Sequence, residues 1–117
     1  MKKIAVLDDD LVVLDILDVA LASVYDVKLF DHPKKLAEYM DHELPDLIVM
    51  DYLLHETNGD LMSKQIKENP LTQHIPIIMF SASILKPQII ENAKCDAYIE
   101  KPFDLTELEN KIASYLN

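Results

Sequence analysis

Four short apolar runs in this chain each end in residues that can do chemistry. The most informative is Asp51, a carboxylate that closes the run 47–50 at the end of an expected buried strand. In an open α/β sheet, ligands bind in the crevice outside the carboxyl ends of the strands. We therefore expect the side chains at the four ends to share one pocket. They are Asp8, Asp9 and Asp10 after 4–7, Asp51, Ser81 after 75–80, and Glu100 and Lys101 after 97–99.

This set of side chains suits Mg²⁺ and a phosphoryl group. Two carboxylates about 4 Å apart repel by roughly 4 kcal/mol at an effective dielectric constant near 20, so clustered acids need a cation or a raised pKa. Mg²⁺ prefers a few carboxylate oxygens together with phosphate. Lys101 would neutralise charge on a transferring phosphoryl group, whose transition state needs mainly positioning and electrostatic stabilisation.

Length and composition predict one acidic domain. The 117 residues suit a single domain over residues 1–117, and the net charge of −10 opposes direct binding to nucleic acid or to an anionic membrane. Cys95 is the only cysteine, which fits a reducing compartment. The apolar run after Lys3 is too short for a signal peptide, and no run approaches the ~18 residues of a membrane span. We therefore expect a cytoplasmic protein without membrane insertion.

Strand-like runs alternate with segments of helical period along the chain. Asp10, Asp31 and Asp104 are expected to cap the helices that follow them, and Asp104 with Glu107 is typical of a capping box. Alternating strands and helices predict a doubly wound parallel sheet with helices on both faces. The expected strands are 3–7, 27–30, 46–50, 75–80 and 96–100. The expected helices are 11–23, one with Pro33 in its first turn that includes Met40, one from Gly59 that stops at Asn69-Pro70, a short one from Pro87 to near Ala93, and one after Asp104 that runs to within a residue or two of Asn117.

In this order the chain resembles, over essentially its whole length, the receiver domain of bacterial two-component response regulators. The resemblance implies a flavodoxin-like (βα)₅ fold with strand order 2-1-3-4-5. No further domain is expected after the last helix, so the chain looks like a stand-alone receiver. The residues that carry the resemblance are Leu7-Asp8-Asp9, Asp51 with Gly59 eight positions later, Ser81-Ala82 and Lys101-Pro102-Phe103.

The resemblance implies a role for each residue at the site. Asp51 would accept a phosphoryl group from a histidine kinase or a histidine phosphotransfer protein. A conformational change would then carry the signal to a protein target, and a homodimer formed on phosphorylation stays open. The domain would be no enzyme in the usual sense, although it would assist its own phosphorylation and dephosphorylation. The other implied roles are Mg²⁺ binding by Asp8, Asp9, Asp51 and the backbone carbonyl of Leu53, phosphoryl contacts from Ser81 and Lys101, a rotamer switch at Tyr98, and a cis bond before Pro102.

Several positions depart from the family pattern. His55 stands where proline is usual, and Leu53 and Ser83 flank the expected route of the attacking water, where an apolar Leu53 would slow hydrolysis. Lys94 replaces a glycine, so a left-handed helix end there would cost roughly 1 kcal/mol or more. The stretch 81–101 is about two residues shorter than usual, a loop-scale deletion. It predicts a short or reshaped helix at 87–93 and an altered output surface.

Two other functions fit part of the sequence. In a haloacid-dehalogenase-like phosphohydrolase, Asp8 would be the nucleophile and Asp10 the acid/base. That assignment leaves Asp51 without a role, and only 16 residues follow Lys101 where the family needs another strand and acidic pair. The second alternative is a receiver that binds proteins without being phosphorylated. A flavin-binding flavodoxin is disfavoured because Gly59 is the only glycine.

Overall fold

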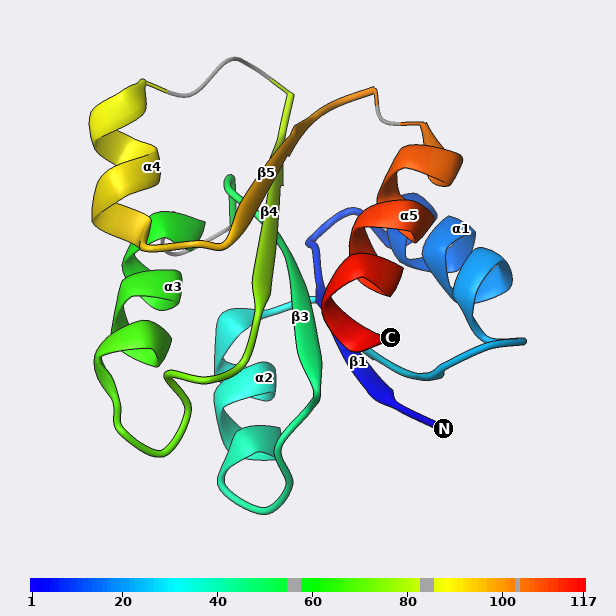
Figure 1. The fold of residues 1–117 in the computed structure, drawn as a ribbon, viewed down its shortest axis with the longest axis horizontal. Coiled ribbons are helices and arrows are strands. Elements are labelled where there is room, and N and C mark those ends of the chain that lie inside the picture. The colour runs from blue at the N-terminus through cyan, green and yellow to red at the C-terminus, as the bar shows by residue number, and fades with distance from the viewer. Residues whose placement is uncertain (55–57, 83–85, 103) are drawn as a thin grey trace.

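The structure, a computed structural model, describes residues 1–54, 58–82, 86–102 and 104–117. Within them, five strands alternate with five helices along the chain (Figure 1). His55, Ser83 and Phe103 lie outside the described residues. The strands are Lys3–Leu7 (β1), Asp26–Phe30 (β2), Leu47–Asp51 (β3), Ile77–Ser81 (β4) and Ala97–Glu100 (β5). The helices are Leu11–Leu21 (α1), Pro33–Met40 (α2), Gly59–Glu68 (α3), Pro87–Ala93 (α4) and Leu105–Leu116 (α5).

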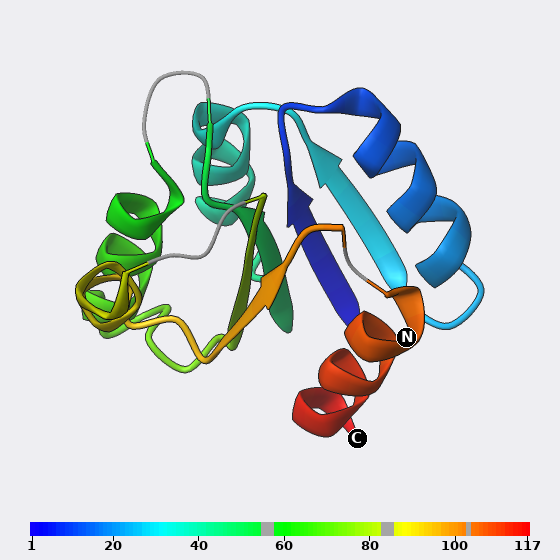
Figure 2. The same ribbon diagram turned by 90° about the horizontal axis from the view of Figure 1, so that it is seen from above.

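The strands form one parallel sheet in the order β2-β1-β3-β4-β5, which confirms the predicted doubly wound fold. Helices α1 and α5 cover one face, while α2, α3 and α4 cover the other (Figures 1 and 2). Every residue of β3 and β4 is buried, as expected for strands that lie between two helical layers. The core is therefore divided by the sheet into two apolar clusters.

The alternation of side chains decides which helical layer each strand residue faces. Val49 and Phe80 pack in the cluster beneath α1 and α5, and Asp51 follows Val49 by two positions on the same face. Met79 and Tyr98 pack in the cluster beneath α2, α3 and α4. Because of this alternation, the candidate site residues Asp51 and Tyr98 lie on opposite faces of the sheet.

Capping explains where three of the helices begin. Asp10 and Asp104 accept hydrogen bonds from the backbone N–H two residues later, at 2.9 and 2.8 Å, and both predicted caps are confirmed. The predicted cap of α2 at Asp31 is wrong. His32 caps this helix through Nδ1, which accepts from the Lys34 N–H at 3.0 Å. The Asp31 carboxylate instead pairs with Lys35 at 2.8 Å.

Helix α4 is short, as predicted, and its carboxyl end is attached to α3. The buried Ser63 hydroxyl on α3 donates a 2.7 Å hydrogen bond to the carbonyl of Ala93. Lys94 then takes the left-handed conformation, with φ 57° and ψ 24°, alone among the described non-glycine residues. Its ammonium lies 3.1 Å from Glu68 on α3. These contacts hold α4 against α3 despite the missing glycine.

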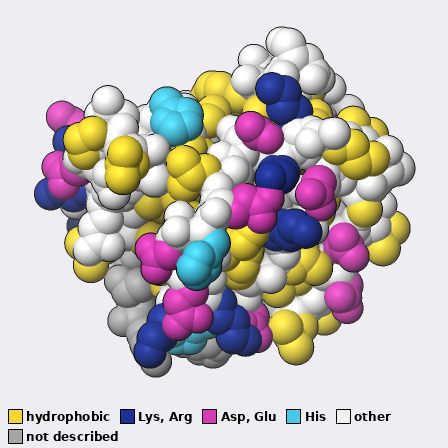
Figure 3. All heavy atoms as spheres, turned by 90° about the horizontal axis from the view of Figure 1, so that it is seen from below, with side chains coloured by type: hydrophobic (Ala, Val, Ile, Leu, Met, Phe, Trp, Pro, Cys, Tyr) yellow, Lys and Arg dark blue, Asp and Glu magenta, His cyan; other side chains and the backbone are white. Residues whose placement is uncertain are grey.

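Carboxylates accept hydrogen bonds from the first N–H groups of β1 and β4, at the end of the molecule seen in Figure 3. Asp46 accepts the Lys3 backbone N–H at 2.7 Å, and Asp96 accepts the Ile77 N–H at 2.8 Å. Lys67 pairs with Asp96 at 2.6 Å. Lysines and acids lie interleaved at this end of the molecule (Figure 3).

Candidate functional site

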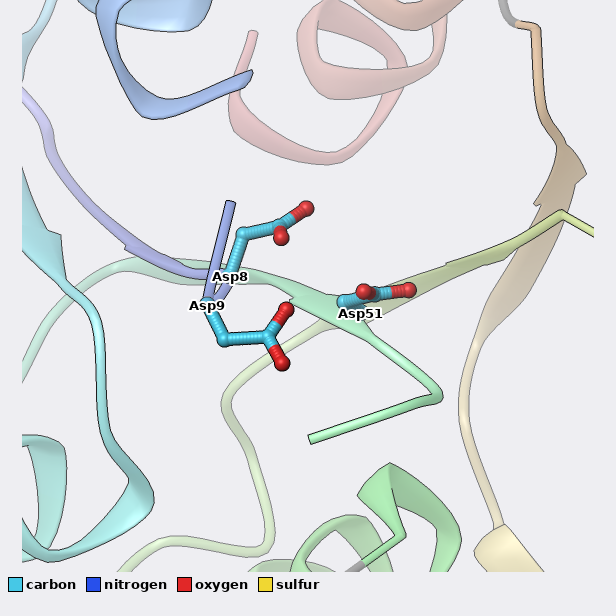
Figure 4. A group of neighbouring side chains, drawn as sticks. All are labelled: Asp8, Asp9 and Asp51. Atoms are coloured by element: carbon cyan, nitrogen blue, oxygen red, sulfur yellow. The ribbon is translucent and has the colours of Figure 1, made fainter. Parts of the chain in front are cut away.

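Three carboxylates meet at the carboxyl end of the sheet. Asp8 and Asp9 follow β1, Asp51 closes β3, and their side chains project from these two strand ends (Figure 4). One oxygen from each lies within 4.8 Å of the others, which is close enough for a shared metal ion. Asp8 is fully buried and Asp51 is 6 % exposed, so water screens their repulsion poorly. An oxygen-only donor set of this kind fits Mg²⁺.

Lys101 brings the positive charge nearest to these acids among the described residues. Its ammonium lies 3.1 Å from Asp8 Oδ2 and 3.5 Å from Asp51 Oδ2. The Lys101 N–H donates to the carbonyl of Ser81 at 2.6 Å, which attaches the lysine to the end of β4. The Lys101–Pro102 bond is cis, as the resemblance implied. One ammonium thus bridges two buried carboxylates.

Gly59 allows the loop after β3 to return close to Asp51. Its N–H donates to the Tyr52 carbonyl at 2.6 Å. A Cβ at this position would lie 2.4 Å from the Asp51 carbonyl oxygen and 3.1 Å from Tyr52 Cα. Both of these atoms belong to backbone, which cannot rotate away as a flexible side chain could. The single glycine is therefore required by a close approach of α3 to the strand that carries Asp51.

Burial, with repulsion from neighbouring carboxylates, raises the pKa of Asp8 and of Asp51. Burial, followed by the charge of Asp8, raises the pKa of Asp51 to about 6 despite the nearby Lys101. Burial likewise raises the pKa of Asp8, opposed first by the hydrogen bond from the Asp10 N–H, at 2.8 Å, and then by Lys101. A cation bound among these carboxylates would relieve this unfavourable energy.

The remaining predicted site residues lie around this group in different ways. Ser81 is buried at the end of β4. Tyr98 is half-buried on β5 and packs in the cluster beneath α2, α3 and α4, away from the face that carries Asp51. Leu53 has an exposed side chain, at 56 %, and forms a β-bridge with Asn58. The sheet therefore separates Tyr98 from the carboxylates.

Phe80 was not among the site residues predicted from the sequence. This residue is 1 % exposed on β4, and the Lys101 ammonium lies 4.7 Å from the centre of its ring. The strand register could have predicted its place near the site, because Phe80 pairs with Asp51 on one side and with Ile99 on the other. Since Lys101 comes two residues after Ile99, the alternation places the lysine on the same face as the ring.

Comparison with known proteins identifies the class. The family model of the response regulator receiver domain matches residues 4–113. A response regulator receiver domain protein (CheY-like) from Methanospirillum hungatei JF-1 superimposes with a TM-score of 0.89 at 25% identity, covering 97% of this chain and 92% of that chain. The response regulator DrrB of Thermotoga maritima gives 0.89 at 26% identity, covering 99% of this chain and 52% of DrrB.

This chain therefore belongs to the receiver domains of two-component response regulators. Among curated proteins it is 30% identical to the phosphate regulon transcriptional regulatory protein PhoB of Pseudomonas aeruginosa, over 98% of this chain and 52% of PhoB. It is 38% identical to the polar-differentiation response regulator DivK of Brucella ovis, over 62% of this chain and 60% of DivK. The matches thus span between half and three fifths of the length of these two relatives.

A membrane span was neither expected nor found in the described part of the chain. None of its helices combines the length and the apolar character needed to cross a bilayer.

Proposed function

We propose that this receiver domain accepts a phosphoryl group on Asp51, with Mg²⁺, and relays it as a protein-to-protein signal. The observation that carries the proposal is the group of three carboxylates, two of them buried, with one ammonium beside the two buried ones. The arrangement provides a nucleophile, ligands for a cation and a counter-charge within one small volume. Membership of the family supports the same assignment.

The proposed reaction forms one bond and breaks one. A carboxylate oxygen of Asp51 attacks the phosphorus of a phosphohistidine on a histidine kinase or a phosphotransfer protein. An O–P bond forms, the P–N bond breaks, and the electron pair stays on the imidazole nitrogen of the donor. Lys101, already 3.5 Å from Asp51 Oδ2, would pair with the phosphoryl oxygens as they arrive.

Asp8, Asp9 and Asp51 would hold the cation, together with the backbone carbonyl of Leu53. When bound, Mg²⁺ supplies positive charge that offsets the charge of the transferring group. The raised pKa of Asp51 supports this, because a cation there favours the ionised, nucleophilic form of the carboxyl group.

Signalling needs a contact that differs between the two states. The phosphoryl group adds about −2 charge and strong acceptors beside Ser81 and Lys101. We propose that Ser81 moves toward these acceptors. Tyr98, which packs in the apolar cluster on the other face of the sheet, would change rotamer in response. The downstream target would be a protein, and formation of a homodimer on phosphorylation is a separate possible outcome.

The hydrolase alternative loses support at Asp10. As acid/base it would have to face the nucleophile Asp8, but its carboxylate accepts the Val12 N–H at 2.9 Å as the cap of α1. The alternative of a non-phosphorylated binding domain remains an outcome of the test below.

The test is the intact mass of the protein after incubation with acetyl phosphate and Mg²⁺. We expect the wild type to gain one acid-labile phosphoryl group of about 80 Da, as an acyl phosphate would be. Asp51→Asn is expected to gain none, whereas Asp10→Asn, which alters only a helix cap, labels normally. Labelling that persists in Asp51→Asn but disappears in Asp8→Asn would favour the hydrolase. A folded wild type that binds Mg²⁺ but takes no label would favour the binding domain.

A further inference from the structure

We propose that Phe80 is a positioning residue, whose ring face holds the Lys101 ammonium over the two buried carboxylates. The proposal rests on the proposed function, because it assigns Phe80 a part in phosphorylation of Asp51. It concerns a contact between two side chains of this chain, 4.7 Å from ammonium to ring centre.

Lys101 is held from several sides. Asp8 and Asp51 attract the ammonium at 3.1 and 3.5 Å, and the ring of Phe80 faces it at 4.7 Å. The face of an aromatic ring carries negative electrostatic potential and attracts a cation within about 6 Å of its centre. An aliphatic side chain of similar size would fill the space without attracting the charge. The ring therefore adds an attraction that packing alone does not provide.

The position of Phe80 makes this contact rigid. The ring is buried, and the strand beneath it pairs with β3 at Asp51 and with β5 at Ile99. The backbone of Lys101 is hydrogen-bonded to Ser81, the residue after Phe80. Lysine has a flexible four-carbon stem whose freedom must be lost before its charge can act at one point. A fixed ring under the ammonium reduces that loss before the phosphoryl group arrives.

The ring contact should also outlast the reaction. Phosphorylation converts the Asp51 carboxylate to an acyl phosphate and moves its negative charge outward, which changes the ion pair at 3.5 Å. The partner on β4 is uncharged and is not consumed. Phe80 therefore keeps the ammonium near the site while its acidic partner changes.

The test replaces Phe80 site-specifically by 3,4,5-trifluorophenylalanine, which keeps the ring's shape but removes most of the negative potential from its face. We expect acyl phosphate formation from acetyl phosphate, at saturating Mg²⁺, to slow by about two- to five-fold, the size of a cation–π contact. Phe80→Leu should slow it at least as much. Ile78→Val is the control, since Ile78 lies two residues earlier in the same apolar cluster. It should lower the unfolding midpoint without changing the rate.

A spectroscopic readout reports the contact directly. In wild-type protein labelled with ¹³C-lysine, the Lys101 side-chain proton resonances should be shifted upfield by the ring, and they are assigned by their loss in Lys101→Arg. Phe80→Leu should abolish this shift. Unchanged rates with the fluorinated ring, or no upfield shift in wild type, would overturn the proposal. If wild type shows the shift but takes no phosphoryl group, the proposed function fails and the positioning role fails with it. The contact itself would then stand as structural.

Discussion

Asp51 is held in a state that a folded protein normally avoids. Two nearly buried acids, Asp8 and Asp51, share one ammonium, and their charges are compensated incompletely. The raised pKa values of Asp8 and Asp51 reflect the energy of keeping both groups ionised in a buried place. Such unfavourable energy is expected where a cation is to be bound, because the positive charge relieves the repulsion between the carboxylates.

The first prediction concerns the charge on Asp51. Its pKa of about 6 in the metal-free native state exceeds the ordinary value of 3.8, so the native state binds the proton more tightly than the unfolded state. The free energy of unfolding should therefore fall as pH rises from about 4 to 6, and Asp51→Asn should raise it by about 2 kcal/mol near pH 7.

Urea unfolding in the absence of Mg²⁺ measures this effect at both ends of the pH range. The gain from Asp51→Asn should shrink toward zero near pH 3, below both pKa values, where the acid is mainly protonated in both states. Asp15→Asn, on the exposed side of α1, is the control for removing one charge. An equal gain at both pH values would mean that the Asp51 charge is not the cause.

At the scale of elements, the sequence predicted the strands and helices better than their ends. All ten were expected, since apolar runs and helical period alternate clearly. β4 begins at Ile77 rather than residue 75, although the Pro76 carbonyl still accepts the Ile48 N–H at 2.9 Å. The cap of α2 was misplaced because Asp31 is the better capping type by propensity, but its carboxylate is taken by Lys35. Contacts between elements, such as that of Phe80 with Lys101, depend on the register between neighbouring strands. The pattern of apolar and polar residues along the chain does not give this register.

The second prediction tests the close approach of α3 to β3. Gly59→Ala would place a Cβ 2.4 Å from the Asp51 carbonyl, so the loop or the strand end must move. We expect a loss of about 1–3 kcal/mol in the free energy of unfolding, together with weaker Mg²⁺ binding, measured by urea unfolding and by calorimetric titration. Gln65→Ala, exposed on the same helix, should change neither. If Gly59→Ala binds Mg²⁺ as tightly as the wild type, this glycine is not needed for the geometry of the carboxylate group.

The third prediction concerns the attachment of α4. Ser63→Ala leaves the Ala93 carbonyl without its buried donor, which should cost about 1–3 kcal/mol and increase amide hydrogen exchange in α4. Ser114→Ala is matched to it, since that hydroxyl donates to the Lys111 carbonyl at 2.6 Å but is exposed. Equal effects of the two substitutions would show that burial of the Ser63 bond is unimportant.

At the scale of the whole molecule, charge is distributed unevenly between the two ends of the sheet. The amino ends of the strands carry paired charges, whereas the carboxyl ends of β1 and β3 hold the three clustered acids (Figures 3 and 4). The net charge of −10 adds to the attraction for a cation. This asymmetry is consistent with the proposal that a cation binds at the carboxyl end.

The fourth prediction follows from that asymmetry. Mg²⁺ should stabilise the native state by about 2.7 kcal/mol when present at 100 times its dissociation constant, measured as a rise in the unfolding midpoint. Asp9→Asn should lose most of the rise, whereas Asp15→Asn should keep it, since Asp15 lies outside the acidic group. A similar rise in both variants would mean that Mg²⁺ acts through general charge screening.

The most direct test of the central claim locates the phosphoryl group by chemistry. Protein treated with acetyl phosphate and Mg²⁺ is reduced with borohydride, which converts an aspartyl phosphate to homoserine, and the peptides are sequenced by mass spectrometry. We predict homoserine at position 51 and at no other aspartate. Homoserine at position 8 instead, or its absence from a folded, Mg²⁺-bound protein, would contradict the assignment of Asp51 as the phosphoryl acceptor.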